Sequence, residues 1–447
     1  MSGISQALNA AANHIGALDR ALSLIQLNIG NASTPGYARQ DLGAAIDNSS
    51  SAVVSQQQSS RNEFAETAVR QQNSLFGHFD QLSSSLASVE TNFSASGTTG
   101  IPAAINNLFA SFSALSAKPN DNAARQTVID EAIKLAHTFN STAGTLTGIQ
   151  SDTRQQVSAH VDTINHLASL VETYNAQHQS SSATGSDPIV DAKLHETLEQ
   201  LSAVSNIQAL PQTDGSITLL LNGQTPLVVG ENQYKITADV TSGPSAAIRD
   251  SFGADITAQV SGGRLSASLQ VVNQSIPGYL NSLNQLAQGI ADTVNTALAA
   301  GVDANGNAGG PLFAYGTSVN AASTLATTAL TPGEVAAATP GAPGGNGNAL
   351  ALSALGTTQT LNGLSFSNFY GNLSATVGRD VSNAKDSLSV QTQLLAQARA
   401  QRTTDSGVSL DEEAVRLVDF QRAYQATAKL VTILDELSQT TIDMVRP

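Results

Sequence analysis

The sequence predicts a mainly α-helical protein with a small β domain in the middle of the chain. Both ends carry apolar residues at helical spacing, further helical patterns fill most of the chain between them, and a β-prone stretch interrupts these at about 206–262. Because the two ends can pair, we expect an elongated out-and-back rod. Its N- and C-terminal helices would pair as a coiled coil, and the middle helices would form a long bundle with the β domain inserted.

The N-terminal segment carries a heptad seam. Its apolar residues are spaced alternately four and three residues apart over nearly four heptads. Ser2 suits the N-cap, and Pro35-Gly36 signals a turn, so we expect one helix from about residue 3 to 31. The seam consists of Ile4, Leu8, Ala11, Ile15, Leu18, Leu22, Ile25 and Ile29.

The C-terminal segment mirrors the first. Ser409 and Glu412 have the spacing of a capping box, which marks the start of a helix. An apolar stripe follows at spacings of three and four residues, although it drifts around the helix more than the N-terminal seam does. The stripe includes Leu410, Ala414, Leu417, Phe420, Tyr424, Ala428, Val431 and Leu434.

The segments in between divide by pattern. Residues 38–60 look extended or irregular, and Asn222-Gly223 between apolar runs signals a β-hairpin. We expect helices at about 63–95, 102–116, 193–204, 264–300 and 373–402, and strands at 216–221, 225–229 and 233–238. A turn at 118–121 starts a further helix, and a long helix follows to about 179. The expected domains are a terminal coiled-coil core (1–40 with 405–447), a helical rod domain (41–205 with 264–300 and 350–404), a small β domain (206–263) and a Gly/Pro/Ala-rich loop or reduced insertion (301–349).

The composition excludes several classes of function. The 447 residues include no cysteine, so no disulfide framework or thiol nucleophile is possible. The net charge of -15 argues against nucleic-acid binding, which needs a basic face. Only 4% of residues are aromatic, which disfavours a ligand pocket. No apolar run approaches the about 20 residues of a membrane span, and the N-terminus lacks the pattern of a secretory signal.

Signals of catalysis and metal binding are also weak. His160 and His166 lie six residues apart, which does not suit chelation on one helix face. The run Asp303 to Asn307 resembles the start of a calcium loop, but alanines take the places of its later Gly and Glu, so we interpret it as a turn. No phosphate-binding loop occurs. The prediction is that the chain is not an enzyme and has no catalytic residues, no metal site and no cofactor.

The acidic triplet Asp411, Glu412 and Glu413 has an alternative interpretation as a catalytic carboxylate pair. It falls in the first turn of the C-terminal helix, where carboxylates meet exposed N–H groups and the positive end of the helix dipole. We therefore expect the triplet to stabilise the helix end rather than to act in catalysis.

Two motifs carry a resemblance to a known family. The run Asn28 to Gln40 (NIGNASTPGYARQ) resembles the N-terminal signature of the bacterial flagellar axial proteins of rod and hook. The run 406–414 (SGVSLDEEA), continuing to 420–426 (FQRAYQA), is similar to the C-terminal signature of the hook-associated branch of that family. A weaker similarity covers 262–265 and 276–287. The resemblance is poor from about 314 to 348, where longer relatives carry an extra outer domain, and Gly30 stands where the family usually has Ala.

The resemblance implies a structural component of the bacterial flagellum that joins hook to filament by polymerising through paired terminal helices. The implied partners are hook protein, the second hook–filament junction protein, further copies of the chain, and an export chaperone on the C-terminal helix. No nucleic acid or membrane is implied, and the location would be extracellular, after flagellar export without a cleaved signal peptide. Alternatives are another axial protein (hook or distal rod) or a secreted coiled-coil adhesin or enzyme.

The residues expected at the assembly interface come from the seam, the turn after it and the C-terminal stripe. Tyr37 could also be a solvent-facing loop residue. The expected set is Ile4, Leu8, Ile15, Leu18, Leu22, Ile25, Ile29, Asn31, Pro35, Gly36, Tyr37, Leu410, Leu417, Phe420, Tyr424, Val431 and Leu434.

Overall fold

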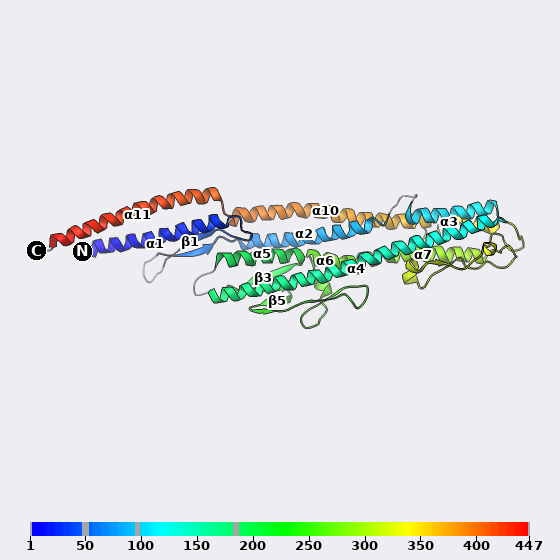
Figure 1. The fold of residues 1–447 in the computed structure, drawn as a ribbon, viewed down its shortest axis with the longest axis horizontal. Helices are drawn as coiled ribbons and strands as arrows, with labels where there is room; N and C mark the ends of the chain where they lie inside the picture. The colour runs from blue at the N-terminus through cyan, green and yellow to red at the C-terminus, as the bar shows by residue number, and fades with distance from the viewer. Residues whose placement is uncertain (1, 47–52, 94–98, 182–186, 446–447) are drawn as a thin grey trace. The chain divides into compact units, whose positions relative to one another are not determined.

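The chain forms two compact units in a computed structural model that describes residues 2–46, 53–93, 99–181 and 187–445 (Figure 1). The terminal unit comprises residues 1–76, 163–235 and 391–447, and the central unit comprises 77–162 and 236–390. Three helices contribute residues to both units: α2 (Glu63–Glu90), α4 (Asn122–Ser181) and α10 (Phe366–Ser406). The structure confirms the predicted fold class, because helix dominates and the sheets are small.

The terminal unit begins with α1 (Ser2–Asn31), which packs along α11 (Leu410–Val445) (Figure 1, blue and red). The seam of α1 faces α11, with Leu18 and Ile25 buried. The expected pairing of the two terminal helices is therefore present within one chain.

The end of α1 differs from the predicted seam. Ile29 is 37% exposed, and Asn28 is buried in its place. The buried residues of α1 are Ala11, Leu18, Ala21, Ile25 and Asn28, so the buried face keeps heptad spacing. It is offset by one position from the predicted seam, because Ala21 and Asn28 are more buried than Leu22 and Ile29.

Residues 38–60, interpreted as extended or irregular, contain an antiparallel hairpin. Its strands are β1 (Gln40–Ile46) and β2 (Val53–Ser59), with Gln40 paired to Ser59. The second strand contains a run of three glutamines and lacks the apolar–polar alternation that marks a half-buried strand. The signal for this hairpin is therefore weak in the sequence.

A four-stranded antiparallel sheet completes the terminal unit, together with α5 (Pro188–Val204), which starts five residues before the predicted helix. Asn222 and Gly223 both have positive φ (50° and 71°), which confirms the predicted hairpin turn. The Asn175 side chain of α4 donates to the carbonyl of Ile217 and accepts from its N–H, at 2.9 Å each, and so fixes the sheet to α4. The strands are β3 (Ile207–Pro211), β4 (Ile217–Leu221), β5 (Thr225–Val229) and β6 (Asn232–Gln233).

The central unit is a helical bundle with one large apolar core. Phe109 and Phe366 stack there with ring centroids 5.8 Å apart, and Phe112 and Phe139 are fully buried. The helices that line this core, besides parts of α2, α4 and α10, are α3 (Gly100–Ala117), α6 (Gly263–Gln270), α7 (Ile276–Ala299), α8 (Ala321–Thr324) and α9 (Gly347–Ala354).

The helix predicted at 264–300 contains a π-helical turn, Val271–Ser275, between α6 and α7. Gln150 donates to the carbonyl of Val272 at 3.0 Å, and Asn273 pairs with both backbone groups of Ala246 at 2.9 Å. This turn holds a further hairpin, β7 (Thr237–Asp239) with β8 (Ala247–Arg249). The run 233–238, predicted as one strand, is thus split between two sheets in different units. The predicted domain boundaries remain a prediction.

The segment 301–349 packs closely against the central core instead of forming an open loop. Ala336 and Ala337 are buried, and Arg125 of α4 donates from Nη1 to the carbonyls of Gly333 and Val335 at 3.2 and 2.6 Å. The segment includes the short strands β9 (Phe313–Ala314) and β10 (Ala326–Thr327). Alanine supplies much of its buried surface, and scattered alanines leave no periodic apolar pattern in the sequence.

A partly buried histidine in the central unit makes the stability pH-dependent. Nε2 of His160 is buried and has no hydrogen-bond partner among the described residues, and burial together with the charge of Arg264 lowers the pKa of His160 to about 4. The unfolded chain binds a proton near pH 6.5 and the folded chain does not. Stability therefore falls as the pH drops from 6.5 to 4, by at most about 3 kcal/mol for this group.

We predict that His160→Gln flattens the pH dependence of the free energy of unfolding between pH 6.5 and 4, as measured by urea titration. The exposed His137 on the same helix is the matched control, and His137→Gln should leave the slope unchanged. Equal slopes for wild type and His160→Gln would contradict the assignment.

Candidate functional site

The structure places the predicted interface residues on α1 (Ile4 to Asn31), in the turn after it (Pro35 to Tyr37) and on α11 (Leu410 to Leu434). Their environments differ: Leu18 and Ile25 are buried, whereas Leu410 is 55% exposed and Pro35 is exposed. Seam and stripe residues that are partly buried are Ile4, Leu8, Ile15, Leu22, Leu417, Phe420, Tyr424, Val431 and Leu434. The intrachain pair therefore covers only part of the predicted interface.

A buried polar centre lies where α1 ends. Oδ1 of Asn28 accepts hydrogen bonds from the Gln40 N–H and from the Tyr37 hydroxyl, each at 2.9 Å. Nδ2 of Asn28 donates to the Gln40 carbonyl at 2.9 Å and to Oε2 of Glu413 at 3.4 Å. One side chain thus joins α1, the turn after it, β1 and α11. We call Asn28, Tyr37, Gln40 and Glu413 the Asn28 centre.

The Asn28 centre holds a buried carboxylate next to a phenol. Burial, with a further contribution from the charge of Glu413, raises the pKa of Tyr37 to about 12. Tyr37 therefore remains a hydrogen-bond donor at any physiological pH. Glu413 lies 3.5 Å from Arg416, and Arg416 lies 3.0 Å from Asp41 on β1. This chain of charges compensates for the burial of the Glu413 carboxylate.

The three acidic residues at the start of α11 lie in different environments. The N–H of Glu412 approaches Oγ of Ser409 at 3.4 Å, as expected for an N-cap, and Asp411 is exposed. Glu413, by contrast, turns inward and is buried against Asn28. The expectation that all three residues serve the helix end was incomplete for Glu413.

A second polar cluster fixes the turn that contains Gly36. Nη2 of Arg61 donates to the Gly36 carbonyl and to Asp191 of α5, each at 2.7 Å. Nη1 of Arg61 donates to Glu66 of α2 at 2.7 Å. One buried guanidinium therefore connects the turn after α1 to two helices, in the fork geometry that arginine provides.

The same cluster extends to α10. Arg402 pairs with Glu199 at 2.6 Å and with Glu66 at 3.4 Å, and Arg399 pairs with Glu199 at 2.8 Å. Burial alone would raise the pKa of Glu199, but hydrogen bonds and charge from Arg402 and Arg399 hold it below the usual range. We call Arg61, Glu66, Asp191, Glu199, Arg399 and Arg402 the arginine cluster.

Most of these polar residues have no role that the sequence predicts. Asn28 lies inside the quoted motif without a predicted contact, and the position of Glu413 predicts only a part in capping. Arg61 and Asp191 come from segments with no recognised motif and are 130 residues apart. A scan for charged residues beside predicted helix starts could have suggested Arg61 and Asp191 separately, but not that they pair.

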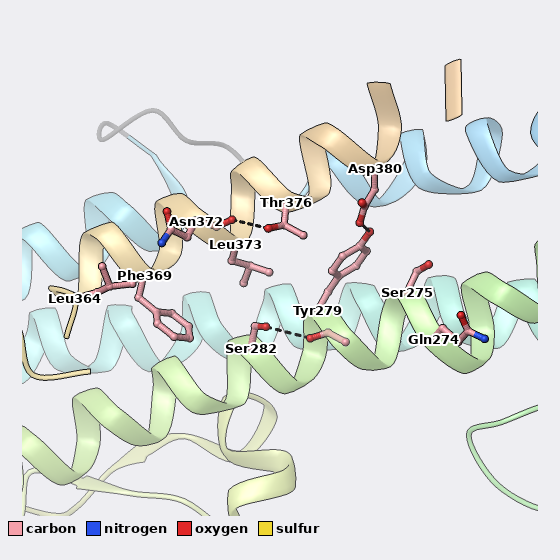
Figure 2. Close-up of a pocket in the computed structure, with 11 residues that line it drawn as sticks. Gln274, Ser275, Tyr279, Ser282, Leu364, Phe369, Asn372, Leu373, Thr376 and Asp380 are labelled. Atoms are coloured by element: carbon pink, nitrogen blue, oxygen red, sulfur yellow. Dashed lines mark hydrogen bonds between the residues drawn. The ribbon is translucent and has the colours of Figure 1, made fainter. Parts of the chain in front are cut away.

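Two cavities lie near polar side chains. One of about 540 Å³ opens between α1, β1 and α11, lined by Leu24, Asn28, Leu42, Arg416 and Phe420 among others. The other, of about 480 Å³, lies between α7 and α10 in the central unit (Figure 2). In the second, Tyr279 donates to Asp380 at 2.6 Å. Burial, with a contribution from Asp380, raises the pKa of Tyr279, so this phenol stays protonated.

Nothing in the described residues suggests metal binding or a membrane span. No group of three or more His, Asp or Glu side chains is placed to hold a metal ion in the part of the chain that the structure describes. Asp303 accepts from the N–H groups of Asn305 and Asn307 at 2.8 Å each, which confirms the predicted turn. Across the same described ranges, no helix is long and apolar enough to cross a bilayer.

We predict that Gly36→Ala destabilises the terminal unit. Gly36 has φ +74°, and a Cβ there would collide with the carbonyl oxygen of Ala192 and lie 2.9 Å from the backbone nitrogen of Glu196. The left-handed conformation alone costs about 1–2 kcal/mol for a residue with a Cβ. We expect a loss above about 2 kcal/mol in the free energy of unfolding, since the strain and the collision add.

Gly30→Ala is the matched control, because Gly30 lies in α1 with no neighbouring atom within 4 Å of the place that a Cβ would take. Alanine is the better helix former, so this variant should gain up to about 1 kcal/mol. Equal destabilisation by both variants would argue against close docking of the Gly36 turn on α5.

We also predict that Asn28→Leu loosens the connection between α1 and β1. It leaves the backbone groups of Gln40 and the Tyr37 hydroxyl without their buried partner, at a cost of about 2–4 kcal/mol. The measurement is hydrogen exchange at the Gln40 amide, which should quicken. Asn13→Leu, at an exposed position of the same helix, should leave that amide protected.

Comparison with known proteins gives two family matches. A model described as the helical domain of flagellar hook-associated protein FlgK matches residues 86–313, and one described as the C-terminal part of flagellar basal body rod FlgEFG proteins matches residues 399–444. The first match covers half of the chain. The second covers most of α11 and the end of α10.

Individual relatives agree with the family matches. Flagellar hook-associated protein 1 of Bacillus subtilis is 25% identical over 501 aligned positions that cover 99% of both chains. The protein of that name from Escherichia coli is 25% identical over 70% of this chain, and the shared region spans 60% of the relative. The solved structure of the flagellar hook junction protein FlgK from Burkholderia pseudomallei has the same fold, with a TM-score of 0.68, 18% identity, and coverage of 78% of this chain and 100% of the other. The chain therefore belongs to the FlgK family of flagellar hook-associated proteins, a family of structural components of the hook–filament junction rather than enzymes.

Proposed function

We propose that this chain polymerises through its paired terminal helices into a tubular helical lattice that joins the flagellar hook to the filament. The observation that carries the proposal is a second apolar face on α11. The first face, which includes Leu417 and Phe420, packs against α1. The second face lies on the other side of the helix and is exposed.

The exposed face of α11 follows helical spacing. At about 100° per residue its members lie opposite the stripe that packs on α1. They are about half exposed or more: Val415 63%, Val418 45%, Leu430 50%, Ile433 53%, Leu437 50% and Met444 82%. They form two groups, at 415–418 and at 430–444, and large apolar side chains exposed in groups mark interaction sites, so the face supports contact with further copies.

The family matches support the junction over other axial proteins. The match to rod-protein C-terminal parts is confined to 399–444, so α11 is the element shared with other axial proteins. The match to the helical domain of FlgK covers 86–313 and favours the hook-associated branch. On this basis the partners are hook protein on one side, the second junction protein on the other, and copies of the chain within the ring. An export chaperone would bind α11 before assembly, and the location would be the extracellular flagellum.

The predicted interface residues retain this role as part of the proposal. Leu18 and Ile25 fix the intrachain pair, whereas Ile29 and Leu410 are exposed enough to meet a neighbouring copy. The Gly36 turn and Tyr37 are held by the arginine cluster and the Asn28 centre, so they present a fixed surface at the base of the paired helices.

We predict that Leu430→Asp blocks assembly while the chain still folds, because it places a charge on the exposed apolar face without touching the intrachain seam. The measurement is electron microscopy of cells that carry the variant as their only copy, which should show hooks without filaments and shed filament subunits. Circular dichroism of the purified variant should match wild type.

The matched control is Gln425→Asp, which adds the same charge at an exposed polar position of α11. It should support normal filaments. Leu18→Asp should also block filament attachment, but by breaking the buried seam of the terminal helices while the central unit stays folded. Normal filaments with Leu430→Asp would refute the proposed role of the second face.

A further inference from the structure

A polar cavity of about 310 Å³ opens to solvent at the surface of the terminal unit, and its lining includes the exposed Thr67, Gln71 and Gln208. Its walls come from α2, the start of β3 and the turn between β4 and β5. Most of the side chains that line it are polar and uncharged, with one arginine among them. The lining residues are Thr67, Arg70, Gln71, Asn206, Ile207, Gln208, Ala209, Asn222 and Gly223.

Arg70 differs from the other buried arginines of the terminal unit. Its side chain is only 8% exposed, yet the one carboxylate within 4.0 Å of it among the described residues is Glu63, at that limit. The Glu63 side chain is itself 52% exposed. Arg61 and Arg402 instead have carboxylate partners at 2.7 and 2.6 Å.

The guanidinium of Arg70 can therefore donate further hydrogen bonds. It donates from Nη2 to the hydroxyl of Thr67 at 3.0 Å, whereas a guanidinium carries five N–H donors in all. A buried cation without a close counter-ion is costly. Burial lowers the pKa of Arg70, against the opposing charges of Glu63 and Glu66. The cation faces a cavity large enough for a small group.

The rest of the cavity wall suits an oxygen-rich anion. The hydroxyl of Thr67 and the side-chain amides of Gln71 and Gln208 can donate hydrogen bonds, and no carboxylate is among the described residues that line the cavity. The fork geometry of arginine matches the paired oxygens of carboxylate and phosphate groups.

We propose that this cavity binds an oxyanion, a carboxylate or phosphate group, paired with the guanidinium of Arg70. The group has two possible sources: a free anion in solution, or an acidic side chain of a second copy of the chain. The proposal goes beyond the junction function, and its first test uses the chain alone in solution, so failure of one does not imply failure of the other.

The first test is titration of the purified full-length chain with inorganic phosphate at constant ionic strength, with the melting temperature as readout. A free-anion site predicts a saturable rise for wild type and none for Arg70→Gln. Arg379→Gln is the matched control, because Arg379 is exposed and lies in the central unit, so it should respond as wild type does. A response of the same size in all three proteins is an ionic effect and overturns the free-anion source.

The second test distinguishes the other source. If a carboxylate of a second copy occupies the cavity, phosphate has no saturable effect, and Arg70→Gln weakens self-association in sedimentation by about tenfold or more relative to Arg379→Gln. Arg70→Lys should recover part of the loss, since it keeps the charge without the fork.

A third variant covers the case in which Arg70→Gln does not fold. Gln208→Ala alters the opposite wall and leaves the buried cation in place, so it should weaken whichever response wild type shows. If no phosphate response is seen and self-association is unchanged in Arg70→Gln and Gln208→Ala, the proposal is wrong.

Discussion

The hydrogen bonds of Asn28 are the interaction on which the terminal unit depends. A single amide joins the end of α1 to the backbone of Gln40, the hydroxyl of Tyr37 and the carboxylate of Glu413. Apolar contacts between α1 and α11 bury surface, but they define the register of the two helices weakly. Leucine and isoleucine side chains can also pack when one helix is shifted along the other. The bonds of the buried amide to Tyr37 and Gln40 fix the chain that follows α1, and its bond to Glu413 favours one register of α1 on α11, as polar core residues do in other coiled coils.

The arginine cluster extends this specification to the rest of the unit. Arg61 connects the carbonyl of Gly36 to α2 and α5, and Arg402 connects the same helices to α10. Buried ion pairs of this type often contribute little net stability, because desolvation offsets the Coulomb attraction. Their effect here is geometric: the turn after α1 meets the helices in one orientation, and Gly36 permits the close backbone approach that this orientation requires.

Periodic and local features of the fold could be predicted from the sequence, whereas contacts between distant segments could not. Heptad spacing predicted α1 and its pairing, and Asn222-Gly223 predicted its hairpin, because each signal is local and periodic. The offset that exposes Ile29 and buries Asn28 was not predictable from apolar spacing, which favours Ile29 over a polar residue at the seam. Arg61 and Asp191 meet only after the chain folds, so no spacing rule finds them. The packing of 301–349 involves several buried alanines, and scattered alanines give no periodic apolar pattern from which an element could be predicted.

A strip of polar residues lies between the two apolar faces of α11 and contains Gln421, Gln425, Lys429, Glu436 and Gln439, all exposed. That strip keeps α11 in solution until both faces are covered. The polar strip thus favours solubility before assembly, and the exposed apolar face favours contact between copies during assembly. Substitutions in either apolar face of α11 are therefore expected to impair folding or assembly more than substitutions in the polar strip.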